Sequence, residues 1–195
     1  MFTRFALPAS RFMAAGACAV LASLVVVPVA GAQQSLSPVE IEAARVETEN
    51  ARADKLEAYA LTLYSTPSKF REVAELHQRA AMIRGDDPRA VDSYRSAAWA
   101  YSAAKNSGLA TQMMVKAADH AAQVGRIEEA ANAYLDAALL ALADKREDRV
   151  LAMLARMHTV VSAPLFPTDE RTRIMERIRT DTRVAHLDPS RRAAP

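Results

Sequence analysis

Cysteine and glycine are the residues that this chain most clearly lacks. The single cysteine, Cys18, lies in an amino-terminal stretch that we expect to be removed, so the remaining chain is predicted to have no disulfide, thiolate metal site or cysteine nucleophile. From Gln33 onward there are only three glycines, Gly85, Gly108 and Gly125, which are too far apart to form a phosphate-binding loop. Two common kinds of chemical site are therefore excluded at the outset.

Histidine is almost as sparse. The histidines are so far apart in the chain that no helix carries two of them three or four residues apart, the spacing that a metal-binding helix face requires. They are His77, His120, His158 and His186. The G-x-S-x-G pattern of a hydrolase nucleophile is absent too. We therefore expect no catalytic residue, no cofactor and no metal, and we predict that the protein is not an enzyme.

An excess of positive charge is also missing. The whole chain has 25 Lys and Arg residues against 23 Asp and Glu residues, which gives a net charge of +2. Both surplus charges, Arg4 and Arg11, lie within residues 1–32, so the segment from Gln33 onward carries 23 charges of each sign and is neutral. Nucleic acids and anionic lipids are usually bound by a strongly basic surface, so neither is expected as a partner.

The first 32 residues are organised like a secretory signal peptide. Arg4 and Arg11 lie before or at the start of an uncharged apolar run over residues 12–29, and Ala30-Gly31-Ala32 matches the small-residue pattern of a cleavage site. Cleavage after Ala32 predicts a mature protein that is periplasmic or secreted and has no stable membrane span. The alternative is an uncleaved membrane anchor, because the apolar run approaches the roughly 20 residues that cross a bilayer.

The rest of the chain is predicted to be all-α, because alanine dominates it and alternating Val, Ile and Thr are absent. Ser37 with Glu40 predicts the first helix start, Asp87-Pro88 opens the third helix, Asn106-Ser107-Gly108 closes it, and Thr168 caps the last one. The expected helices cover residues 38–63, 67–84, 88–105, 109–123, 127–143, 146–161 and 169–185. They form an amino-terminal helix (33–65), a repeat region (66–162) and a carboxy-terminal helix with a disordered tail (163–195).

A motif that occurs twice, 40 residues apart, indicates a repeat architecture. In each copy a glycine is followed by an alanine, a tyrosine and another alanine at the same spacing: Gly85, Ala90, Tyr94 and Ala97, then Gly125, Ala130, Tyr134 and Ala137. A small residue lets a neighbouring helix approach closely, and an aromatic ring a turn away fills the gap beside it. Stacking of the two units predicts one shared core.

At these positions the chain resembles the tetratricopeptide repeat family. Its copies are 40 residues apart rather than about 34, and Met114 and Ala118 stand where the family has an aromatic residue and a glycine. The resemblance implies a short right-handed helix-hairpin solenoid, with an N-terminal capping helix and a C-terminal helix. It also implies a groove that binds a partner protein or peptide. On that mapping the partner-binding residues are Glu72, Glu75, Arg79, Gln112, Asp119, Gln123, Arg146 and Arg149.

The sequence therefore favours an exported scaffold or adaptor that binds another protein. Two alternatives remain open at this stage. One is a structural module of a cell-envelope assembly that self-associates through helix 38–63. The other is a small enzyme or small-ligand-binding protein whose site lies in the helical groove, beside Trp99 or the histidines. We otherwise interpret Trp99, together with Tyr101, as a core residue.

Overall fold

Seven α-helices and one short 3₁₀ helix make up the part of the chain that the computed structural model describes, which is residues 37–181 and Leu187. The predicted signal peptide, the tail beyond residue 187 and the predicted end of the last helix near Ala185 lie outside these residues. The helices are α1 (Pro38–Leu63), η1 (Pro67–Lys69), α2 (Phe70–Arg84), α3 (Ala90–Ala103), α4 (Ser107–Gln123), α5 (Ile127–Ala143), α6 (Glu147–Val161) and α7 (Thr168–Thr180).

The start of α1 has a complete capping box. The Ser37 hydroxyl accepts the backbone N–H of Glu40 at 3.3 Å, and the Glu40 carboxylate accepts the backbone N–H of Ser37 at 2.7 Å. Pro38 occupies the first turn, where its missing N–H costs nothing. The bounds of α1 and of α5 are those expected from the sequence.

Several helix boundaries differ from the sequence prediction. The helix α2 begins at Phe70 rather than at residue 67, because Pro67–Lys69 form the separate 3₁₀ helix η1. The helix α3 begins at Ala90 rather than Pro88, because the Asp87 carboxylate accepts the backbone N–H of Arg89 at 2.8 Å and holds a turn ahead of the helix. Gly108 does not end a helix but lies in the first turn of α4, which the Asn106 side chain caps by accepting the N–H of Leu109 at 3.2 Å.

The carboxy-terminal helix also begins differently. Thr168 is the first residue of α7 rather than its cap, and Pro167 occupies the capping position with no side-chain hydrogen bond. The helix ends at Thr180. The Arg171 guanidinium donates to the carbonyl oxygens of Val161 at 2.6 Å and Ala163 at 3.1 Å, and so ties α7 to the end of α6.

Positive φ angles recur every 20 residues along the array. They occur at Gly85 (54°), Lys105 (58°), Gly125 (79°) and Lys145 (54°). In the last three turns the third residue past the helix donates its N–H to a carbonyl five residues back: Asn106 to Tyr101 at 2.9 Å, Arg126 to Ala121 at 2.8 Å and Arg146 to Ala141 at 3.2 Å. This is the Schellman arrangement, in which a left-handed residue closes the helix.

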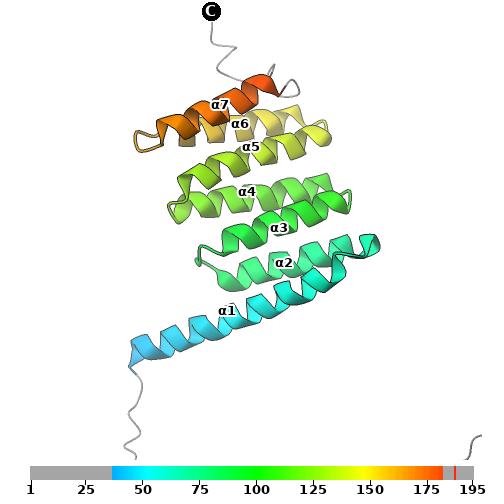
Figure 1. Cartoon of the computed structure of the whole chain (residues 1–195), viewed down its shortest axis with the longest axis vertical. Helices are drawn as coiled ribbons and strands as arrows, with labels where there is room; N and C mark the ends of the chain where they lie inside the picture. The colour runs from blue at the N-terminus through cyan, green and yellow to red at the C-terminus, as the bar shows by residue number, and fades with distance from the viewer. Residues whose placement is uncertain (1–36, 182–186, 188–195) are drawn as a thin grey trace, which may run out of the picture. The chain divides into compact units, whose positions relative to one another are not determined.

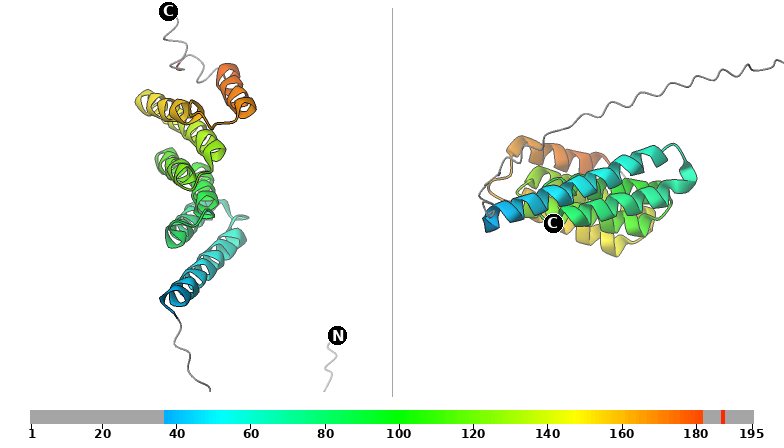
Figure 2. Two further views of the ribbon diagram at one scale, coloured as in Figure 1. Left: turned by 90° about the vertical axis from the view of Figure 1, so that its left-hand side faces the viewer. Right: turned by 90° about the horizontal axis from the view of Figure 1, so that it is seen from below.

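Each helix from α1 to α5 packs against the next one in the chain, and α7 lies against α5 (Figure 1). Side views show α2, α4 and α6 in one row and α3, α5 and α7 in a second row (Figure 2). All of these helices belong to one compact unit. The described chain is therefore an all-α array in which neighbours in sequence are neighbours in space.

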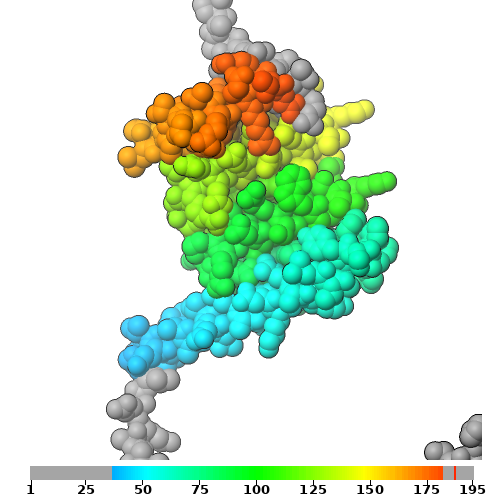
Figure 3. Space-filling model, in the orientation of Figure 1, coloured from blue at the N-terminus to red at the C-terminus, as the bar shows by residue number. Residues whose placement is uncertain are grey.

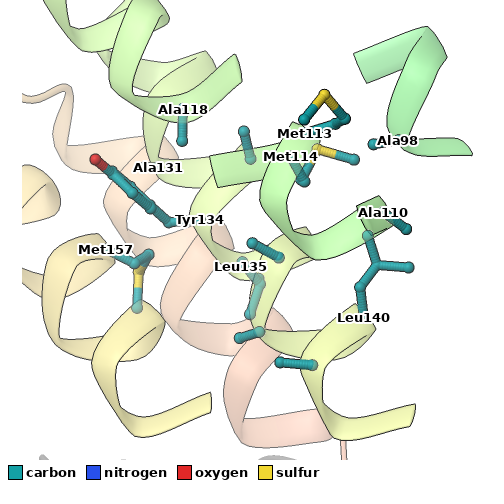
Figure 4. Close-up of a cluster of buried hydrophobic side chains, with 14 of the residues drawn as sticks. Ala98, Ala110, Met113, Met114, Ala118, Ala131, Tyr134, Leu135, Leu140 and Met157 are labelled. Carbon is teal, nitrogen blue, oxygen red and sulfur yellow. The ribbon is translucent and has the colours of Figure 1, made fainter. Parts of the chain in front are cut away.

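The core of the array consists of alanine with a few larger side chains. Met113, Met114, Leu135 and Met157 are almost fully buried between alanines of adjacent helices (Figure 4). Alanine lets two helix backbones approach closely, while the flexible methionines fill the gaps that remain.

The repeated motif contributes to this core. Its four alanines, Ala90, Ala97, Ala130 and Ala137, are fully buried. Tyr134 is nearly buried, and Tyr94 packs on a second small cluster that contains Val91, Ala117, Ala121 and Ala130. The expectation that Trp99 is a core residue is wrong, because it is 49% exposed, whereas Tyr101 is buried as expected.

Candidate interaction surface

The predicted binding residues of α2 lie on its outer surface. Glu72 pairs with Lys69 at 2.8 Å and Glu75 pairs with Arg71 at 3.0 Å, and in both pairs the partners lie three or four residues apart. Arg79 is exposed further along the same helix. These are solvated local pairs. Glu72, Glu75 and Arg79 do not line a common hollow in the described part of the chain.

The helix α4, which follows α2 in the row of α2, α4 and α6, forms a hollow with α6. This hollow has a volume of about 410 Å³ and is lined by Thr111, Gln112, Val115 and Lys116 of α4 and by Arg149 and Met153 of α6. Gln112 and Arg149 are two of the predicted binding residues. Val115 and Met153 are partly buried and give the hollow an apolar floor, and Lys116 is placed by the Tyr94 ring, whose centre is 5.8 Å from its Nζ.

Asp119 is held by two neighbours rather than left open. Its carboxylate accepts the hydroxyl of Tyr134 and lies 3.3 Å from Nη1 of Arg156. Burial raises the pKa of Tyr134 to about 12, and the hydrogen bond to the Asp119 carboxylate adds to the effect. Asp119 therefore links α4, α5 and α6.

The last two predicted residues lie at helix ends. Gln123 is the exposed final residue of α4. Arg146 is the capping residue of α6 and pairs with Asp148 in the same turn at 3.1 Å. Of the eight predicted binding residues, the structure thus brings only Gln112 and Arg149 into one hollow.

A buried polar cluster between α1, α2 and α3 was missed by the sequence reasoning. Arg84 is buried and donates to both carboxylate oxygens of Glu57, at 2.6 and 2.7 Å, and to Asp54 at 2.6 Å. It also donates to the Ser93 hydroxyl, which in turn donates to Glu57 at 2.7 Å. Because Glu57 and Arg84 are 27 residues apart and on different helices, no short-range spacing in the sequence predicts the pair.

This cluster sets the charge state of Glu57. Burial alone would raise the pKa of the carboxyl group, but the nearby His77 ring and hydrogen bonds from Arg84 and Ser93 outweigh burial and hold the pKa well below its usual value. His77 is also buried, with Nδ1 3.7 Å from Glu57 and Nε2 3.4 Å from the Tyr64 hydroxyl.

Glu57, His77 and Arg84 line a hollow of about 330 Å³, but the cluster lacks the geometry of a nucleophilic site. Serine catalysis requires a histidine within hydrogen-bond reach of the hydroxyl. Here the Ser93 hydroxyl donates to Glu57 and not to His77. The arrangement is that of a buried ion pair that joins three helices.

Within residues 37–181 and at Leu187, no three His, Cys, Asp or Glu side chains gather in a way that would hold a metal ion. None of the helices described there is long and apolar enough to cross a membrane. In comparisons with known proteins, no family model, curated protein or solved structure matches the chain.

Proposed function

We propose that this chain is an exported, non-enzymatic scaffold that binds another protein through the face formed by α4 and α6. On this proposal the helix array is a short right-handed solenoid of helical hairpins, similar to tetratricopeptide repeats. The signal-like sequence of residues 1–32 supports export.

Contacts between alternate turns support the solenoid. Arg126 in the α4–α5 turn donates to the carbonyl oxygen of Pro88 in the α2–α3 turn at 2.9 Å, and His120 Nε2 lies 3.1 Å from the carbonyl oxygen of Asp87. On the opposite side of the array, Ser107 donates to Asp144 of the α5–α6 turn. Turns about 40 residues apart thus lie next to each other, as in stacked hairpins of this length.

The observation that carries the binding proposal is the hollow between α4 and α6. It combines an apolar floor, Val115 and Met153, with the polar and cationic side chains of Gln112, Lys116 and Arg149. Binding sites of this kind place an apolar anchor in the hollow and use surrounding charges for orientation. The expected ligand is a peptide segment with one apolar side chain and a neighbouring carboxylate.

The test is capture of partners from the cells that produce the protein, with the full chain expressed from its own start. Gln112→Arg fills the hollow from an exposed position, so we expect it to reduce recovery of bound partner at least about tenfold. Thr159→Arg makes a matched change at an exposed position of α6 outside the hollow and is expected to leave recovery unchanged. Equal recovery by both variants, or no enriched partner, would refute the proposal, and the mass of the purified chain reports cleavage after Ala32.

A further inference from the structure

The amino-terminal part of α1 extends beyond the helix against which α1 packs. α1 has 26 residues, whereas α2 has 15. Every residue from 38 to 48 is exposed, and the first fully buried residue of the helix is Ala53. We call residues 38–48 the α1 overhang. It projects from the rest of the helix array in Figure 3 (blue).

The overhang continues an apolar stripe that is buried elsewhere in the same helix. Ala53 and Ala60 are buried, and the same helix face runs back from them at intervals of three and four residues, through the polar Asn50 and then the apolar Val46, Ala43 and Val39. Val46 is 42% exposed and Val39 is 77% exposed. A stripe at this spacing forms one face of a helix and packs against another helix. In the overhang, no described part of the chain covers that face.

A hollow lies along this face. It has a volume of about 940 Å³ and includes Val39, Ala43, Val46 and Ala51 of α1, together with Arg89 from the connection before α3. Its acidic members are Glu42, Glu47 and Asp54. The hollow therefore has an apolar floor and a mainly acidic rim.

The charge of this segment is strongly one-sided. Residues 38–54 contain five carboxylates and two arginines. Arg45 is engaged by Glu42 at 2.6 Å and by Glu49 at 2.7 Å. Asp54 is engaged by Arg84 at 2.6 Å and lies 3.8 Å from Arg89. Glu47 makes no ion pair with any residue that the structure describes, although it lines the hollow. A ligand that carries cations beside an apolar face would therefore complement this surface.

We propose that the α1 overhang is a docking surface for a helix of a partner protein that is apolar on one face and flanked by Lys or Arg. The docked helix would extend the row of α2 and cover Val39, Ala43 and Val46. A second copy of this chain is the poorer occupant, because pairing two overhangs places one acidic rim against another. The surface is separate from the α4–α6 hollow, and the proposal does not depend on that site.

The test uses a synthetic helical peptide of about 18 residues with leucine on one face and lysine on its flanks. A second peptide carries glutamate in place of each lysine. Binding to the full chain and to a chain that begins at Gln33 is measured by fluorescence anisotropy. We expect the lysine peptide to bind both chains, with an affinity that falls at least about tenfold between about 50 and 500 mM salt.

Two matched variants locate the binding face. Val46→Glu places a charge within the stripe and is expected to weaken binding at least about tenfold. Ile41→Glu makes the same kind of change at a 57% exposed apolar residue that lies outside the hollow, and binding should stay within about twofold. Circular dichroism checks that both variants remain helical.

Any of four results would overturn the proposal. Equal binding of the glutamate peptide, or equal weakening by Ile41→Glu, would show that the stripe and its rim do not select the ligand. Binding only by the chain that begins at Gln33 would show that residues 1–32 occupy the surface instead. A dimer in light scattering that Val46→Glu dissociates would assign the surface to a second copy.

Discussion

Arg84 and Glu57 show how single residues can join three helices of an alanine-rich array. Alanine side chains bury little surface each, so contacts between larger groups contribute more of the specificity. Arg84 donates to Glu57 and Asp54 of α1 and to Ser93 of α3, while itself belonging to α2. Breaking a buried ion pair is costly because the remaining charge is left without its partner. The cluster therefore makes the packing of α1 on the array depend on the ionisation of Glu57.

The dependence on pH has a definite sign. The pKa of Glu57 is lower in the folded protein than in the unfolded chain, so its ionised form stabilises the fold above about pH 4.3 and that contribution is lost as the pH falls through the folded pKa. We predict that Glu57→Gln lowers the free energy of unfolding by about 3 kcal/mol at neutral pH. The gap from the wild type should begin to narrow below about pH 4.3 and should continue to narrow as the pH falls towards the lowered pKa of Glu57.

Urea unfolding at a series of pH values measures this gap. The control is Glu47→Gln, at an exposed carboxylate of α1, which should match the wild type at every pH. A Glu57→Gln gap that persists unchanged into acid would mean that packing, and not the carboxylate charge, accounts for the loss.

At the scale of the helices, the turns set the period of the array. Lys105 has a φ of 58° at the end of α3, in a conformation that costs an L-residue about 1 kcal/mol and a glycine much less. We predict that Lys105→Gly raises the free energy of unfolding by about 1 kcal/mol, as measured by urea unfolding. Lys116→Gly is the matched control inside α4, and there the same substitution should lower the free energy of unfolding by about 1 kcal/mol. Two changes of the same sign would contradict the argument.

These turns also explain how far the sequence alone could lead. The start of α1 was predictable because Ser37, Pro38 and Glu40 each act on their own helix end. The turn at Gly125 was visible because glycine is the usual residue at positive φ. Lys105 and Lys145 take the same conformation although lysine does not predict a positive φ. The glycine between the third and fourth predicted helices, Gly108, is helical instead.

The binding residues were harder to predict than the helices. Gln112 and Arg149 meet in one hollow, but Asp119 is bound to Tyr134 and Arg156, which belong to other helices. The pairing of Glu57 with Arg84 likewise depends on which helix faces pack together. Periodicity gives the exposed face of one helix, whereas a contact between two helices requires their relative position.

For the helix array as a whole, the order of contacts predicts how instability spreads. Helices that pack mainly against their neighbours in sequence are coupled mainly to those neighbours. The helix α7 is tied to α5 by Arg177, which donates to Asp136 at 2.7 Å, and by Glu170, which accepts from Asn132 at 3.2 Å. Its Ile174 and Ile178 are buried in the same core cluster as Leu135 and Leu154. Loss of packing at α7 should therefore reach α5 and α6 before it reaches the first helices.

Ile178→Ala tests this order, because it removes a fully buried side chain at one end of the array. A cavity of this kind costs about 2–4 kcal/mol locally. We predict that hydrogen exchange accelerates at least about tenfold for amides of α5, α6 and α7 and changes less than about threefold in α1 to α3. Leu165→Ala, at an 88% exposed residue before α7, is the control and should leave all helices unchanged. Equal acceleration in every helix would mean that the array unfolds as a single cooperative unit, and the nearest-neighbour description would then be wrong.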